Sequence, residues 1–138
     1  MILVSACLAG FNCRFDASNK ENEKIVQLIK EGKAIPVCPE QLIGLPTPRK
    51  AGECPVDGKV VSEDGEDFSE AFLRGAKATL DLCKKYNCTK AILKSYSPSC
   101  GSNKIYDGNF NGALRDGDGV TAKLLKENGI EVISDKDL

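Results

Sequence analysis

Four short apolar runs, separated by segments with helical periodicity, constrain the fold of this 138-residue chain more than any other feature. The runs, all rich in residues that favour strands, cover residues 2–6, 34–37, 91–94 and 130–133. Between them, apolar side chains recur every three or four residues over 22–31, 68–86 and 120–128, which predicts three helices. This alternation is typical of a parallel sheet whose strands are connected by crossover helices.

The length fits one domain, and we expect residues 1–138 to form a single α/β domain. The predicted fold is a small three-layer doubly wound domain of the Rossmann or flavodoxin-like type, with a mainly parallel sheet of about four strands and long site loops. A strand order of 2-1-3-4 is compatible with the pattern, which does not itself determine the order. Pro36 cannot donate a ladder hydrogen bond, so the second strand is expected at or near an edge.

The remaining segments are interpreted as loops with one small accessory element. Residues 42–55 are rich in proline and predict an extended irregular loop, and 59–62 predicts an accessory strand or hairpin. Residues 95–119 are expected to be loop throughout. Its glycine- and aspartate-rich stretches, 107–112 and 116–119, lack the spacing of a calcium or phosphate loop and are interpreted as turns that cover the site.

Composition excludes several classes of function. The net charge is −1, without the clustered positive charge that a phosphate backbone requires, so no macromolecular nucleic acid partner is expected. No apolar run approaches the roughly 20 residues of a membrane span, and no membrane association is expected. The N-terminal residues lack the basic flank and apolar length of a secretory signal, so we expect a cytoplasmic protein.

Seven cysteines and no histidine define the chemistry that is available. An odd number of cysteines without an export signal argues against a disulfide framework, because the cytosol keeps thiols reduced. The lack of histidine removes the usual general base and the commonest nitrogen ligand. A metal site must therefore be built from thiolates, carboxylates or exogenous ligands.

Three cysteines lie at or just beyond the carboxyl ends of predicted strands: Cys7, Cys38 and Cys100. Open α/β sheets place their sites in the crevice outside these strand ends, so the three thiols are expected to meet there. Cys83 and Cys88 lie on and just after a helix and are interpreted as structural. The roles of Cys54 and Cys13 are not decided by the sequence. Cys13, beside Arg14, is a candidate fourth ligand or persulfide acceptor.

Three thiolates without a nearby fourth are compatible with an iron–sulfur cluster that leaves one iron open to bind and polarise a substrate atom. Structural zinc needs four ligands and would have to recruit Cys13 or Cys54. Glu40 is the nearest proton carrier, or else a solvated loop charge. Ser97 and Ser99 are candidates to hydrogen-bond a substrate, although serine beside proline often only shapes a turn.

Several motifs in fixed order resemble the domain-of-unknown-function 523 family, whose members are known as 2-thiouracil desulfidases (TudS), and the resemblance covers nearly the whole chain. The motifs lie at residues 4–10, 13–16, 36–41, 44–49, 93–94, 97–101, 105–108 and 119–122. The resemblance implies a 4Fe-4S cluster held by Cys7, Cys38 and Cys100, with Cys13 as the competing residue of the first motif. It also implies a catalytic role for Glu40 and an assisting one for Ser97.

We therefore expect an iron–sulfur-dependent desulfidase that hydrolyses a thiolated nucleobase or a related small thiocarbonyl, without net electron transfer and without a nicotinamide or flavin. Its expected partners are this small-molecule substrate and the iron–sulfur assembly machinery. Two alternatives remain. One is a non-catalytic zinc module closed by Cys7, Cys13, Cys38 and Cys100, and the other is a thiol-based persulfide sulfur carrier.

Overall fold

A four-stranded parallel sheet lies at the centre of the computed structural model, which describes residues 1–138. Its strands are β1 (Ile2–Ser5), β2 (Ala34–Val37), β5 (Lys90–Leu93) and β8 (Glu131–Ser134). They lie in the order β2-β1-β5-β8, which is a 2-1-3-4 arrangement, and every pair is parallel. β2 is an edge strand, as its proline predicts, and Pro36 lies opposite Val4.

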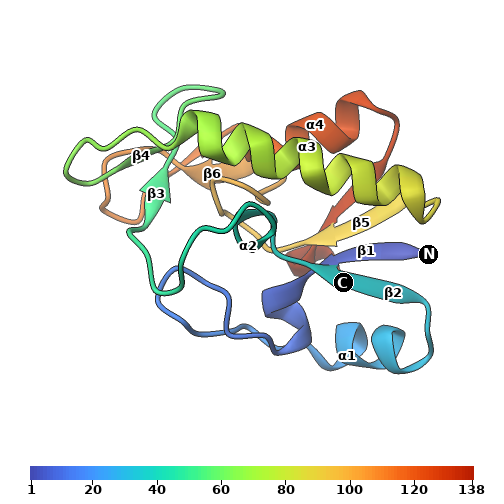
Figure 1. Cartoon of the computed structure of the whole chain (residues 1–138). Coiled ribbons are helices and arrows are strands. Elements are labelled where there is room, and N and C mark those ends of the chain that lie inside the picture. The colour runs from blue at the N-terminus through green and yellow to red at the C-terminus, as the bar shows by residue number, and fades with distance from the viewer.

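Helices cover both faces of this sheet, which confirms the three-layer α/β fold (Figure 1). α1 (Glu23–Lys30) lies on one face, while α3 (Ser69–Lys85) and α4 (Val120–Glu127) lie together on the other. Asn22 caps the N-terminus of α1, where its side chain accepts a hydrogen bond from the Lys24 N–H at 2.9 Å, and Lys30 lies in the last turn, where the helix dipole favours a cation. None of the helices combines the length and apolar character that crossing a lipid bilayer requires.

Alternation along the strands divides the core into two layers. On β1, Leu3 packs in the cluster beneath α3 and α4, whereas Val4 packs in the cluster above α1. On β5, Leu93 likewise packs in the cluster beneath α3 and α4, and Ile92 packs in the cluster above α1. Each such fully buried side chain contributes about 1.5–3 kcal/mol. The three-and-four spacing of apolar residues over 68–86 also predicts Leu73 on the buried face of the helix, and this was wrong, since Leu73 is 41 % exposed.

Two single-turn helices occupy segments that the sequence predicts as loops. The 3-10 helix η1 (Ala6–Ala9) follows β1 directly, and α2 (Pro39–Leu42) follows β2 after one residue. Proline is suited to the first turn of a helix because its missing N–H needs no partner there. One turn is too short to produce a helical period in the sequence, which is why both were missed. Figure 1 shows α2 at the carboxyl ends of the strands.

The expected loop at 95–119 contains an antiparallel hairpin, so that prediction was wrong in part. The hairpin consists of β6 (Lys104–Tyr106) and β7 (Leu114–Asp116). Within these two strands only Ile105 is buried, so they lack the apolar alternation that marks a strand in sequence. The accessory hairpin near 59–62 is confirmed as β3 (Gly52–Glu53) paired with β4 (Val61–Ser62). A 3-10 turn, η2 (Asp135–Asp137), ends the chain.

Candidate functional site

A cavity of about 440 Å³ lies at the carboxyl edge of the sheet. The side chains proposed from the sequence that line it are Cys7, Cys13, Cys38, Glu40, Ser97 and Cys100. The expected convergence of three cysteines from three distant loops is therefore present, and the fourth candidate, Cys13, lies with them. Of the two glycine-rich turns expected to cover the site, only 107–112 lines this cavity, through Phe110 and Gly112.

Cys7 and Cys13 are held by the loop that follows β1. Cys7 lies within η1, and its carbonyl oxygen accepts a hydrogen bond from the Lys20 N–H at 2.9 Å, which closes the loop. Gly10 turns the chain with a φ of 95°, and a Cβ there would lie 2.6 Å from the Glu21 carboxylate. The turn brings the two cysteines to the lining of the same cavity.

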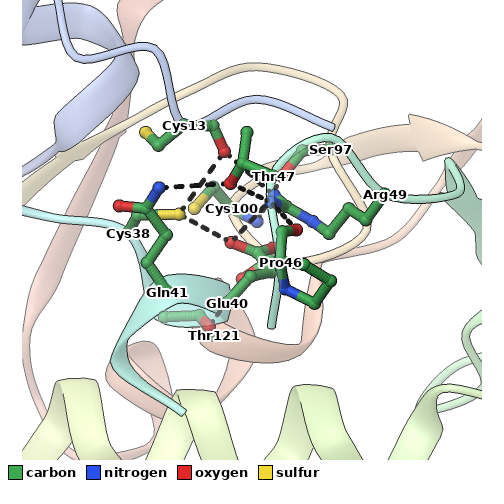
Figure 2. Close-up of polar contacts among 11 residues, drawn as sticks. Cys13, Cys38, Glu40, Gln41, Pro46, Thr47, Arg49, Ser97, Cys100 and Thr121 are labelled. Carbon is green, nitrogen blue, oxygen red and sulfur yellow. Dashed lines mark hydrogen bonds and ion pairs between the residues drawn. The ribbon is translucent and has the colours of Figure 1, made fainter. Parts of the chain in front are cut away.

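Cys38 is the N-cap residue of α2 and follows the edge strand β2. Its thiol lies 3.2 Å from Glu40 Oε2 and 3.8 Å from the carbonyl oxygen of Cys13 (Figure 2). Its position depends on α3, because Gly75 approaches the Pro39 carbonyl so closely that a Cβ would lie 2.6 Å from it. The packing of α2 against α3 therefore fixes Cys38 and Glu40 together.

Cys100 sits in a tight turn that packs against the first residues of α4, whose Val120 and Thr121 N–H groups donate to the Pro98 and Ser99 carbonyls at 2.8 Å. The Cys100 N–H donates to Ser97 Oγ at 2.6 Å, while Ser99 Oγ pairs with a hydroxyl of α4, that of Thr121, at 2.8 Å. Gly119 is pressed against this turn, since a Cβ would lie 2.5 Å from the Ser99 carbonyl. Ser97 therefore shapes the turn and also lines the cavity, whereas Ser99 is 1 % exposed and does not line the cavity.

An ion pair that sequence reasoning missed connects the cysteine loops. Arg49 Nη2 lies 3.8 Å from Glu40 Oε2, with side-chain exposures of only 14 % and 11 %. The same nitrogen donates to the Cys13 carbonyl at 3.1 Å, and Nη1 reaches the Pro46 carbonyl and Thr47 Oγ1 (Figure 2). Arg49 is the last residue of the family motif at 44–49. Membership of that motif was the only signal in the sequence that could have identified Arg49 as a site residue.

Lys94 is a second cationic residue of the cavity that was not proposed from the sequence as a site residue. It follows β5 and donates to Ser95 Oγ at 2.8 Å, and its ammonium lies 3.9 Å from Asp135 Oδ2. Burial lowers the pKa of Lys94, against the opposing effect of the Asp135 carboxylate. Together with Arg14, Arg49 and Lys50, Lys94 makes four cationic residues in the cavity lining.

Three of the cavity thiols, those of Cys13, Cys38 and Cys100, have raised pKa values. Burial, followed by the Glu40 carboxylate, raises the pKa of Cys100 to about 12. The pKa of Cys38 is also raised, first by its hydrogen bond with Cys13 and then by burial. The Cys38 bond lowers the pKa of Cys13, but the hydrogen bond with Cys7 and burial outweigh it and raise that pKa to about 11. These thiols stay protonated at neutral pH unless a bound metal displaces their protons.

The donor set fits an iron–sulfur cluster better than a single ion. No three cysteine, aspartate or glutamate side chains lie close enough to one another to bind one metal ion. A closed zinc site needs four sulfurs about 2.3 Å from the metal, so the zinc alternative is not preformed. In a 4Fe-4S cluster each thiolate binds a different iron, so the ligands surround a larger volume. Four cysteines around a cavity of about 440 Å³ match that requirement.

The other three cysteines lie outside the cavity lining. Cys83 and Cys88 are buried in the core cluster between the sheet and α3, as their structural interpretation predicts. Cys54, which the sequence left open, is 1 % exposed in a separate core cluster. Its sulfur lies 3.8 Å from the Pro98 carbonyl, so it packs behind the Cys100 turn.

Comparisons with known proteins agree with this geometry. A family model described as 2-thiouracil desulfurase matches residues 2–137. The uncharacterized protein YbbK of Bacillus subtilis (strain 168) is 46 % identical over 147 residues, which span 100 % of this chain and 97 % of YbbK. The solved structure of the 4Fe-4S-dependent thiouracil desulfidase TudS (DUF523Vcz) superposes with a TM-score of 0.93 at 43 % identity, covering 99 % of this chain and 91 % of TudS.

Proposed function

The chain belongs to the 2-thiouracil desulfurase family, and from that premise we propose that it is a 4Fe-4S-dependent desulfidase acting on a thiolated nucleobase or a related small thiocarbonyl. The observation that carries the proposal is the meeting of Cys7, Cys38 and Cys100 with Glu40 in one cavity at the sheet edge. The reaction replaces the substrate's C=S sulfur with oxygen from water and releases hydrogen sulfide. Atoms balance without electron transfer, so no nicotinamide or flavin is required.

Cys7, Cys38 and Cys100 are the proposed cluster ligands, one from each strand-end loop. A cluster with three protein thiolates supplies one iron that binds a sulfur atom and makes the attached carbon more electrophilic. Cys13 lines the same cavity as Cys7, and its carbonyl oxygen lies 3.8 Å from the Cys38 sulfur, so the first ligand is tested by comparing Cys7→Ser with Cys13→Ser. Cys7→Ser should lose the cluster and Cys13→Ser should keep it; the reverse result would assign the first ligand to Cys13.

Glu40 is the proposed proton acceptor for the attacking water. Its carboxylate is largely shielded from solvent and oriented by Arg49, and Oε2 accepts the Cys38 thiol proton at 3.2 Å. A metal-bound Cys38 carries no proton, which frees that oxygen to accept a hydrogen bond from water. In a chain without histidine, Glu40 can take the water proton as the C–O bond forms and return it to the departing sulfur.

Ser97 is the proposed hydrogen-bond donor to the substrate. Its oxygen already accepts the Cys100 N–H, so the proton of its own hydroxyl is not used in the turn. Because Ser97 lines the same cavity as the cysteines, this proton can be directed to an oxygen or nitrogen of the substrate ring. The hydroxyl thereby links the position of Cys100 to that of the substrate.

Anaerobic purification tests the proposal against its two alternatives. We expect a brown protein that contains iron and acid-labile sulfide in equal amounts, acquired from the iron–sulfur assembly machinery, and that converts 2-thiouracil to uracil. A colourless protein with stoichiometric zinc and no turnover would support the zinc module instead. A persulfide carrier would still transfer sulfur after the iron is chelated away, whereas the desulfidase would lose its activity.

A further inference from the structure

Phe110 forms part of the wall between the cysteine cavity and a second cavity beside it. It lies at the tip of the hairpin formed by β6 and β7, and it lines both cavities. The second cavity, also of about 440 Å³, shares Lys50, Ala51 and Glu63 with the first. The Phe110 ring therefore stands where the two spaces adjoin.

Among the four aromatic side chains that line the cysteine cavity, Phe110 is the one whose ring has no partner. Phe72 is 8 % exposed and belongs to the core. Tyr106 packs edge-to-face on a neighbouring tyrosine with ring centroids 6.0 Å apart. Phe15 carries an arginine guanidinium 5.7 Å from its ring. Phe110 takes part in no aromatic pair or cation–π contact, so its ring is available to a ligand.

A buried carboxylate from the neighbouring hairpin holds Phe110 in place. Glu53 Oε1 accepts hydrogen bonds from the Gly108 N–H at 3.0 Å and from the Phe110 N–H at 3.2 Å. Glu53 is 9 % exposed and forms no ion pair. The two N–H groups therefore stabilise its carboxylate through hydrogen bonds that the negative charge strengthens. Glu53 therefore connects β3 to the hairpin tip.

The backbone of the hairpin tip needs such a restraint. Phe110 has a φ of 53°, in the left-handed region that a residue with a Cβ seldom adopts without support. Gly108 has a φ of 94° and lies so close to Pro55 that a Cβ would meet its backbone at 2.9 Å. The tip therefore packs closely against the segment after β3. The hydrogen bonds from Glu53 fix the backbone at Phe110 and with it the orientation of the Phe110 side chain.

We propose that Phe110 is a specificity-determining residue that stacks on the planar ring of the substrate, and that Glu53 is the positioning residue that presents it. This inference rests on the proposed function, since a thiolated nucleobase is a flat ring with two π-faces. Stacking of a base on an aromatic side chain typically contributes about 1–3 kcal/mol, so removing the aromatic ring should cost about tenfold in affinity.

Uracil binding to the anaerobic holoprotein, measured by calorimetry, tests the role of Phe110 without requiring turnover. Phe110→Leu keeps an apolar side chain and removes the π-face; it should weaken uracil binding and raise KM for 2-thiouracil, each about tenfold. Its kcat and iron content should stay within about twofold of the wild-type values, because stacking acts on binding. Phe110→Tyr, the matched control, should bind as the wild type does. Equal uracil affinity in wild type and Phe110→Leu, or no uracil binding by the wild type, would overturn the inference.

Glu53 variants test whether this residue acts through Phe110. Glu53→Ala should reproduce the weaker binding, whereas Glu53→Gln, which keeps an acceptor oxygen for both N–H groups, should restore it. The double variant Glu53→Ala/Phe110→Leu should bind no more weakly than Phe110→Leu alone, and additive losses would contradict the positioning role. If Glu53→Ala does not fold, loss of uracil affinity in a folded Glu53→Gln protein contradicts the role instead. Failure of the wild type to desulfurise 2-thiouracil contradicts only the proposed function.

Discussion

Two groups of buried cysteines lie a short distance apart in this fold and have different surroundings. Cys83 and Cys88 are 1 % and 5 % exposed, and their thiols are in contact in the core between the sheet and α3. Cys7 and Cys100 are 7 % and 6 % exposed, and they line the cavity at the strand ends. Burial alone therefore does not distinguish a structural cysteine from a candidate ligand.

The neighbours of the thiols make the distinction. Burial is the first cause of the raised pKa of Cys83, about 12, and no carboxylate contributes to it. Cys13, Cys38 and Cys100 in the cavity also have raised pKa values, but the Glu40 carboxylate contributes to each of these three. A set of thiols with a shared carboxylate, nearby cations and open volume is equipped for chemistry, while a thiol pair among aliphatic side chains only fills space.

The largest expected effect separates the two groups directly. Cys100→Ser should abolish cluster retention and all desulfidase activity, because serine does not replace a thiolate on iron. Cys88→Ala, the matched core control, should keep the full iron and sulfide content. Iron analysis and the visible absorption of anaerobic protein measure both. Loss of the cluster in Cys88→Ala with the fold intact would break the comparison.

Glu40→Gln should separate the chemistry from the ligand set. The amide has nearly the same shape but cannot accept the water proton, so we expect a brown protein with kcat reduced on the order of 10²–10⁴-fold. Glu127→Gln, at an exposed end of α4, should leave turnover unchanged. If Glu40→Gln and Cys100→Ser lose the cluster to the same extent, Glu40 is a structural residue.

Arg49→Lys tests whether the cavity depends on its ion pair. Lysine keeps the positive charge but lacks the planar guanidinium that contacts Glu40, Cys13 and the 46–47 segment at the same time. We therefore expect kcat to fall about tenfold while the cluster is retained. Arg74→Lys, on the exposed side of α3, should have wild-type kinetics. An unchanged kcat in Arg49→Lys would show that charge alone suffices.

The smallest effect on activity belongs to the core pair. Cys83→Ala should lower the free energy of unfolding by about 1–2 kcal/mol, because it leaves a small cavity beneath α3. Urea unfolding of the apoprotein measures this change, and kcat of the folded holoprotein should equal that of the wild type. Inactive but normally stable Cys83→Ala protein would mean that the core thiols take part in the reaction.

The sheet was predictable because each of its strands is an apolar run between turn signals. The segments that escaped prediction are those whose conformation depends on contacts made elsewhere in the fold. The β6–β7 hairpin buries a single strand residue, Ile105, and is held by contacts with 53–55 that are distant in the sequence. α2 is one turn long and is placed by α3.

The site was predictable where topology alone assembles it. Cys7, Cys38 and Cys100 follow three strands of one parallel sheet, so their meeting follows from the strand pattern. Arg49 and Phe110 enter the cavity from loops whose paths no sequence period encodes. The sequence left Ser97 with two possible roles, binding a substrate or shaping a turn, and the structure shows the second, since its oxygen accepts the Cys100 N–H.

Turnover of 2-thiouracil by the anaerobic protein in water labelled with oxygen-18, without any reductant, tests the central claim most directly. We predict that uracil carries the label at the carbon that bore sulfur and that one sulfide forms per uracil. Labelled uracil should form on the order of 10²–10⁴-fold more slowly in Glu40→Gln and at the wild-type rate in Cys83→Ala. Unlabelled uracil, or brown protein that leaves 2-thiouracil unchanged, would contradict the account.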